Sequence, residues 1–182
     1  DQALERYPNQ ALLYFYNGVA YYSKKEFEKA IRFLSYGRKY VGDPNLLEFF
    51  YAQLGDAHNA LEQHTQSDEA YEKALELNPS NEHVLNNYSY FLCLRNQQLL
   101  KAQEMAKKLI QKYPENATYL DTYGWVLYTM KQYEEAEIYL KKAALVDENG
   151  TVIEHYGDVL FELGKFKEAL TQWIRAKELG GT

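Results

Sequence analysis

The sequence predicts an all-α fold built from consecutive antiparallel helix pairs. A small residue recurs within apolar helical patterns at intervals of 33 to 37 residues, and periods of this length are typical of repeat architectures. Apolar residues around each small residue follow the spacing of an amphipathic helix. Only 4 of the 182 residues are prolines, which leaves room for long helices. The recurring small residues are Gly18, Gly55, Ser89, Gly124 and Gly157.

Each recurring small residue marks the first helix of a repeat. A bulky residue lies four positions before it and another lies three positions after it, so both share one helix face. Asp43, Asn81 and Asn116 precede three of these helices as N-cap residues, and Pro44 occupies a first helical position. First helices are expected near residues 10–22, 45–59, 82–94, 117–130 and 150–162.

A second helix follows in each repeat. It opens with another small residue about twelve positions later, and a mostly larger residue stands four positions further on, as in Ala136 and Leu140. Second helices are expected near residues 26–40, 67–77, 99–112, 133–145 and 166–178. The extra residues between Gly18 and Gly55 are expected to form a longer loop from Val41 to Leu46.

The small residues are expected where the two helices of a pair approach closely. Glycine inside a helix costs roughly 1 kcal/mol relative to alanine, and close packing of the flanking residues would offset that cost. Because Ser89 fills an equivalent position, replacement of Gly124 by alanine is expected to be nearly neutral. Leucine at position 124 would overpack the crossing.

The spacing resembles the tetratricopeptide repeat, whose signature is W-x2-L-G-x2-Y, then A-x3-F, then P. Two units end with the matching proline, Pro79 and Pro114. The resemblance covers the chain as one domain, residues 1–182, with repeats near 11–44, 48–81, 82–116, 117–149 and 150–182. It implies an α-solenoid coiled into a right-handed superhelix. Residues 1–10 match the end of a preceding repeat, which predicts a longer parent chain. The stretches 86–90 and 121–125 resemble those of long bacterial tetratricopeptide proteins.

Composition argues against several classes of function. The net charge of −6 disfavours binding to a nucleic-acid backbone, and no apolar run reaches the 18 residues that a membrane span needs. Cys93 is the only cysteine, so no internal disulfide is possible. The four histidines lack metal-ligand spacing, and no phosphate-binding loop motif occurs. The sequence therefore predicts no catalytic constellation, no cofactor and no metal site.

Binding is the role that the resemblance implies. In such arrays the first helices line a concave groove that holds a peptide or a partner segment. Any one aromatic residue there could instead pack between neighbouring first helices, and this alternative stays open for Trp125. The candidate groove residues are Tyr16, Tyr22, Asp56, Asn59, Asn86, Asn87, Tyr90, Asp121, Trp125, Tyr128, Glu154, Asp158 and Phe161.

The groove positions and their flanks carry acidic residues and no lysine or arginine. This favours a ligand segment that is both apolar and basic, and it disfavours a free carboxylate tail. Lysine at position 158 is expected to weaken such a ligand without a large effect on the melting temperature. The lysine and arginine of carboxylate-clamp repeats are absent, and so is the asparagine ladder of repeats associated with glycosyltransferases. The acidic residues are Asp56, Asp121, Glu154, Asp158 and Glu162.

Two hypotheses of function follow. The first is a non-catalytic protein-interaction scaffold. The alternative is a self-association module that stacks through its terminal repeats, as a homo-oligomer. The sequence leaves the compartment open between the bacterial cytoplasm and the cell envelope.

Overall fold

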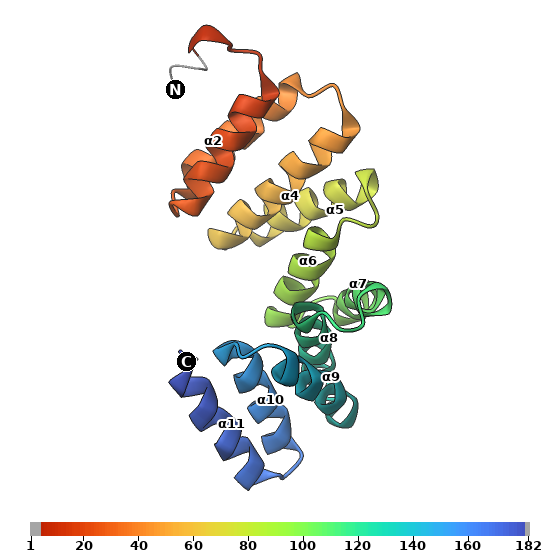
Figure 1. Ribbon diagram of the computed structural model, residues 1–182. Helices are drawn as coiled ribbons and strands as arrows, with labels where there is room; N and C mark the ends of the chain where they lie inside the picture. The colour runs from red at the N-terminus through yellow and green to blue at the C-terminus, as the bar shows by residue number, and fades with distance from the viewer. Residues whose placement is uncertain (1–4, 181–182) are drawn as a thin grey trace. The chain divides into compact units, whose positions relative to one another are not determined.

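The computed structural model describes residues 5–180, and Figure 1 shows a succession of helix pairs along this range. Residues 1–4, where the predicted end of a preceding repeat begins, lie outside the described part. The first helices are α2 (Ala11–Ser23), α4 (Pro44–Ala60), α6 (Glu82–Leu94), α8 (Ala117–Thr129) and α10 (Gly150–Glu162). The second helices are α3 (Phe27–Gly37), α5 (His64–Leu77), α7 (Leu99–Lys112), α9 (Tyr133–Val146) and α11 (Phe166–Glu178). A 3-10 helix, η1 (Arg38–Tyr40), follows α3.

The chain divides into two compact units, one up to Val84 and one from Leu85 onward. In the first unit α2 packs on α3, α3 on α4, and α4 on α5. In the second unit α7 packs on α8, α8 on α9, α9 on α10, and α10 on α11. Within each unit these helices contact their neighbours along the sequence, which is the packing expected of a repeat array.

The predicted helix ends and caps are largely confirmed. Asp43 accepts a hydrogen bond from the backbone N–H of Asn45 at 3.0 Å, with Pro44 as the first helical residue. Asn81 accepts one from Val84 at 3.0 Å and Asn116 accepts one from Tyr119 at 3.2 Å. These bonds satisfy N–H groups that have no partner inside the helix.

Two predicted boundaries are wrong. The helix α5 begins at His64 rather than at residue 67, because Ser67 occupies its fourth position and not its first. The longer loop expected from Val41 to Leu46 does not form. Only residues 41–43 separate η1 from α4, and the extra residues lengthen α4 by one turn at its N-terminus, from Pro44 to Leu47. The Asp43–Pro44 cap places the helix start there.

The turns within the pairs share a left-handed residue seven positions after each recurring small residue. Lys25, Glu62, Asn96 and Lys131 have φ values between 52° and 61°, and Gly164 has φ 73°. This backbone conformation reverses the chain so that the second helix can begin two or three residues later. A non-glycine residue in it is mildly strained, so four of the five turns are held by the packing of the helices around them.

The glycines of the first helices lie against a large side chain of the second helix. A Cβ atom built on Gly124 would lie 2.7 Å from Leu140 Cγ and 3.2 Å from the Leu140 backbone nitrogen. The same atom on Gly18, Gly55 or Gly157 would lie 2.5 to 2.6 Å from the residue sixteen positions later. These residues are Leu34, Tyr71 and Trp173. The close approach predicted for the pairs is therefore present.

The nearly neutral Gly124→Ala expectation is corrected by the same geometry. Contacts below 3.0 Å require a neighbour to move, so a methyl group does not fit against Leu140. Ser89 is a misleading comparison, because the residue sixteen positions after it is Ala106 and not a large side chain. Both Ser89 and Ala106 are fully buried. The small and large residues are matched in size within each pair.

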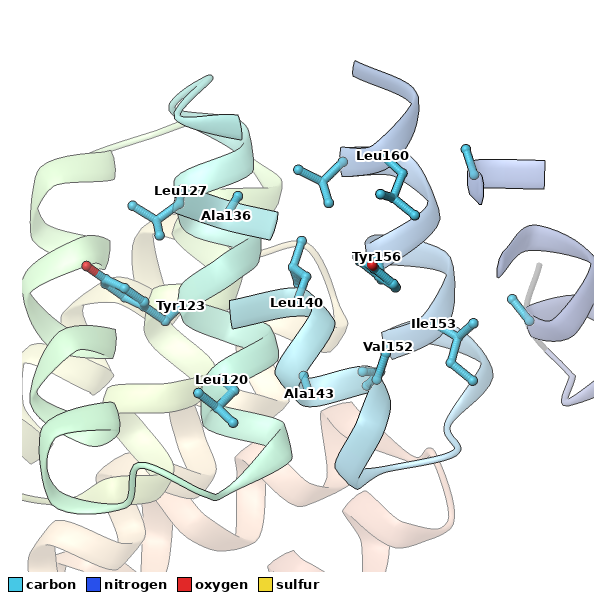
Figure 2. Packing of buried hydrophobic residues seen from close by; sticks show 14 of the residues in the cluster. Leu120, Tyr123, Leu127, Ala136, Leu140, Ala143, Val152, Ile153, Tyr156 and Leu160 are labelled. Carbon is cyan, nitrogen blue, oxygen red and sulfur yellow. The ribbon is translucent and has the colours of Figure 1, made fainter. Parts of the chain in front are cut away.

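Each unit has its own apolar core. In the second unit the core joins α8, α9 and α10, and Figure 2 shows Leu140 between the side chains of α8 and α10. Leu120, Leu127 and Ile153 are almost fully buried there. The core of the first unit includes Tyr14, Leu34, Phe50 and Leu54.

We expect Gly124→Ala to destabilise the second unit by about 1–3 kcal/mol, and Leu140→Ala by about 2–5 kcal/mol. In the double variant the new methyl group fills part of the space that leucine leaves, so its cost should fall below the sum by about 1 kcal/mol or more. Urea unfolding of the four proteins measures this coupling. Gly42→Ala is the control, because a Cβ atom there meets nothing within 4 Å. Additive costs would contradict the size-matching account.

Candidate binding surface

In the second unit, polar contacts join successive first helices. Thr122 Oγ1 on α8 donates to Asn86 Oδ1 on α6 at 2.9 Å. Asp121 Oδ1 on α8 lies 2.9 Å from His155 Nδ1 on α10. Two predicted groove residues, Asn86 and Asp121, therefore also hold neighbouring repeats together.

A cleft of about 280 Å³ lies beside these contacts. Three predicted groove residues, Asn86, Tyr90 and Asp121, contribute to its wall, and the remaining wall comes from α8 and the segment that leads into α10. Two carboxylates line it and no lysine or arginine does. We call it the acidic cleft; its lining residues are Asn86, Tyr90, Thr118, Asp121, Thr122, Asp147, Asn149, Thr151 and Val152.

Burial and negative charge govern the ionisable groups of this surface. Burial, and then the nearby charge of Asp121, raises the pKa of the Tyr90 hydroxyl. Tyr90 therefore keeps its proton and can both donate and accept a hydrogen bond at neutral pH. Asp121 is itself only 8% exposed, and its carboxylate lies against His155.

An aromatic group follows Asp121 along α8. The Trp125 ring stacks on His155 with centroids 3.9 Å apart and on Tyr128 with centroids 4.6 Å apart. We call Trp125, Tyr128 and His155 the aromatic shelf. Trp125 is half-buried within it, so part of its ring already packs inside the protein. Burial, followed by the charges of Asp158 and Glu162, raises the pKa of Tyr128 to about 12.

Asp158 has an internal hydrogen-bond partner. Trp173 Nε1 donates to Asp158 Oδ1 at 2.8 Å, and Asp56 Oδ1 in the first unit accepts from the Tyr71 hydroxyl at 2.5 Å. Both aspartates directly follow the glycine of their helix, and both donors are the large residue packed on that glycine. The expectation that lysine at position 158 would spare the melting temperature is therefore corrected, since it would remove this bond.

The predicted groove residues of the first unit do not line the acidic cleft, and they differ from one another in burial. Tyr16 is exposed, while Tyr22 and Asn59 are partly buried. Asp56 is only 4% exposed, and its Oδ2 lies 2.6 Å from His83 Nε2. The hydrogen bond to Asp56 raises the pKa of His83. The Asp56 carboxylate thus serves contacts within the unit.

The other candidates lie on the second unit. Asn87 and Glu154 are partly buried, and Phe161 is exposed beside the rings of Phe166 and Trp173. None of these three residues lines the acidic cleft.

Sequence reasoning missed the cleft residues outside the helical stripe, namely Thr118, Asp147, Asn149 and Thr151. Thr118 lies at the start of α8, Asp147 and Asn149 lie in the turn before α10, and Thr151 lies in the first turn of α10. Asn149 caps α10 by accepting from the Thr151 N–H at 2.9 Å. The Asp-Glu-Asn-Gly-Thr stretch at 147–151 signals such a cap, and that signal could have placed this turn beside the first helices.

We expect the Cys93 thiol to be unreactive in the folded protein. Its Sγ lies 2.9 Å from Thr129 Oγ1, and burial raises its pKa to about 11, so almost no thiolate is present at pH 8. A disulfide reagent such as 5,5′-dithiobis(2-nitrobenzoate) should react slowly at pH 8 without denaturant. It should react rapidly in about 6 M guanidinium chloride, because only hyperstable proteins stay folded above roughly 5 M. Equal rates in both conditions would contradict this burial.

Comparison with known families identifies the repeats. One family model described as tetratricopeptide repeat matches residues 50–81 and 117–149, and a second with the same description matches residues 70–104. A TPR repeat-containing protein of Pseudomonas aeruginosa is 31% identical over 145 residues, which are 79% of this chain. The chain spans about a quarter of the length of that relative, 24%.

Solved structures share the fold. PilF from Pseudomonas aeruginosa has a TM-score of 0.80 at 23% identity, over 95% of this chain and 78% of its own. MamA from Desulfovibrio magneticus has a TM-score of 0.78 at 21% identity, over 93% of this chain and 94% of its own. These likenesses confirm the predicted all-α solenoid class.

Across residues 5–180 no helix has both the length and the apolar character to span a bilayer. Within the same range no cluster of three or more histidine, cysteine, aspartate or glutamate side chains is arranged to hold a metal ion. The repeated helix pairs, their spacing and the family matches agree, and the chain is a tetratricopeptide repeat protein.

Proposed function

We propose that the second unit binds a segment of a partner protein across α6, α8 and α10, with a basic side chain of that segment in the acidic cleft. Tetratricopeptide repeats are generally non-catalytic modules for protein–protein interaction, which supports a scaffold role for this chain. The observation that carries the finer proposal is the cleft itself, which has two carboxylates and no basic side chain in its lining.

The donors of a lysine or arginine side chain match this lining. An ammonium or guanidinium group needs several oxygen acceptors, which Asp121, Asp147 and Asn149 supply. Asp121 contacts His155 through Oδ1, and a carboxylate has further acceptor capacity beyond one bond. Charge complementarity of this kind favours basic partners and slows the approach of acidic ones.

The aromatic shelf would contact an apolar residue of the same segment. Trp125 lies one helical turn after Asp121 on α8, so basic and apolar contacts fall on one face. Because stacking on His155 and Tyr128 already orders Trp125, little side-chain entropy remains to be lost on binding. The ligand is therefore a segment with both basic and apolar residues, and a free carboxylate tail is disfavoured.

The test uses a fluorescent peptide of alternating leucine and lysine, followed by fluorescence anisotropy at low salt. We expect Asp147→Lys to weaken binding about tenfold or more, because it reverses one charge of the cleft. Within residues 5–180 the Asp147 side chain forms no hydrogen bond or ion pair, so its replacement changes the charge without the loss of an internal bond that a change at Asp158 would cause. The control is Glu104→Lys, an equal charge change on the exposed side of α7.

The wild-type affinity should also fall as salt rises, since exposed charges are screened. A matched peptide of alternating leucine and glutamate should bind much more weakly. If the Asp147→Lys and Glu104→Lys proteins bind the lysine peptide with equal affinity, and salt does not change the affinity of the wild type, then the acidic cleft is not the binding site.

A second candidate function is self-association. Phe166, Leu170 and Ile174 recur every four residues on α11 and are each more than half exposed, at 60%, 56% and 54%. Single exposed apolar residues are common on protein surfaces, whereas a contiguous row of them marks an interaction site.

For this candidate, light scattering should show a mass that rises with protein concentration, and Leu170→Glu should return it to the monomer value by placing a charge in the apolar contact. Thr171→Glu, an exposed neighbour outside the stripe, is the control. A monomer at all concentrations would exclude self-association through this face.

A further inference from the structure

A pocket of about 150 Å³ lies in the first unit between α3, α4 and α5. Tyr51 and Leu54 of α4 form part of its wall, and α5 contributes Gln66, Glu69 and Lys73. No residue of the predicted groove lines it. Its chemistry also differs from that of the acidic cleft, because basic side chains meet there.

Two cations converge on one aromatic ring in this pocket. The guanidinium carbon of Arg38 lies 5.4 Å from the centroid of Tyr51, and Lys73 Nζ lies 5.6 Å from the same centroid. Within residues 5–180 neither side chain makes an ion pair or a hydrogen bond. Like charges repel, and Glu69 is the only carboxylate among the residues that line the pocket with these two cations. A bound anion would offset the remaining positive charge.

Of the three basic residues that occupy the position of Lys73 in other repeats, two form ion pairs, and the third, Lys108, is exposed. Lys142 and Arg175 stand two positions after the large residue packed on the glycine, as Lys73 does. Lys142 pairs with Glu115 at 2.6 Å and Arg175 with Glu148 at 3.1 Å. Each of these glutamates directly precedes the N-cap of a first helix.

The repeat that contains Lys73 has no such acid. The residue before the N-cap Asp43 is Gly42. Lys73 therefore lacks the carboxylate that Lys142 and Arg175 contact, and it lies instead over Tyr51 at the pocket.

Arg38 also departs from the repeat pattern. It stands eight residues after Ala30, in the 3-10 helix η1. The positions eight after Ser67, Ala102 and Ala136 hold apolar residues, which are Leu75, Ile110 and Ala144. The position eight after Ala169 holds Lys177, so a charged residue stands at this place in two of the five repeats. A guanidinium stands there only at Arg38, in η1.

We propose that this pocket is an oxyanion site that binds a phosphate group, either free or carried by a phosphorylated side chain. A guanidinium offers paired donors that fit phosphate oxygens, and an ammonium adds a compact charge. Ser35 and Gln66 bring further donors to the lining. Glu69 is the one carboxylate there and opposes the anion. His58 also lines the pocket, and its Nδ1 lies 2.7 Å from Gln63 Oε1, which fixes the ring.

The experiment is an NMR titration of the ¹⁵N-labelled chain with inorganic phosphate, at constant ionic strength against sodium chloride. We expect saturable shifts at Ser35, Arg38 and Lys73. Arg38→Gln and Lys73→Gln should each weaken binding about tenfold or more, because each removes a charge-assisted contact. The matched control is Lys108→Gln, since Lys108 is exposed and occupies the position of Lys73 in another repeat.

Glu69→Gln is a second and opposite test, expected to tighten binding about threefold by removing the opposing charge. N-acetyl-phosphoserine amide forms a parallel titration. Binding of both ligands indicates that a phosphorylated side chain fits, and binding of inorganic phosphate alone assigns the site to the free ion. The proposal is overturned if chloride causes the same shifts, or if affinity is unchanged in Arg38→Gln, Lys73→Gln and Glu69→Gln.

Discussion

The helix pairs depend on the approach of a large side chain to a backbone position that has no side chain of its own. Where the first helix has glycine, Leu34, Tyr71, Leu140 or Trp173 fills the space above it. This contact sets the distance between the two helices, and the core of each unit forms around it. In the second unit Leu140 is also part of the cluster that includes Ile153 and Leu160 of the next repeat. One contact therefore supports both the pair and its junction.

Periodicity was sufficient to predict most of the architecture. The recurrence of Gly18, Gly55, Ser89, Gly124 and Gly157 placed the first helices to within a residue or so, because a small residue and its apolar neighbours have a fixed place on such a helix. The Asp43–Pro44 cap placed the start of α4 correctly, but the longer loop expected from Val41 to Leu46 was wrong, since inserted residues can lengthen a helix as readily as a loop. The size match between Gly124 and Leu140 was missed, because Ser89 was compared without its partner Ala106.

The candidate surface was harder to predict for a different reason. Position on a helix face shows that Asp121, Asp158 and Asp56 share a stripe, but it does not show which partner each carboxylate finds. In the structure their partners are His155, Trp173 and Tyr71. The carboxylates of this stripe therefore hold helices together. Other residues that line the acidic cleft, such as Asp147, come from a turn, where helical periodicity gives no signal.

The pairing of each aspartate with an aromatic donor bears on how such arrays can be recombined. Asp56 with Tyr71, and Asp158 with Trp173, are set on opposite helices of one hairpin, next to the glycine that admits the ring. Val19 and Trp125 hold the corresponding places in hairpins that use leucine instead. A chimaera that exchanged only one helix would leave a carboxylate without its donor, or a ring without its glycine. The smallest interchangeable part of this chain is therefore the whole hairpin.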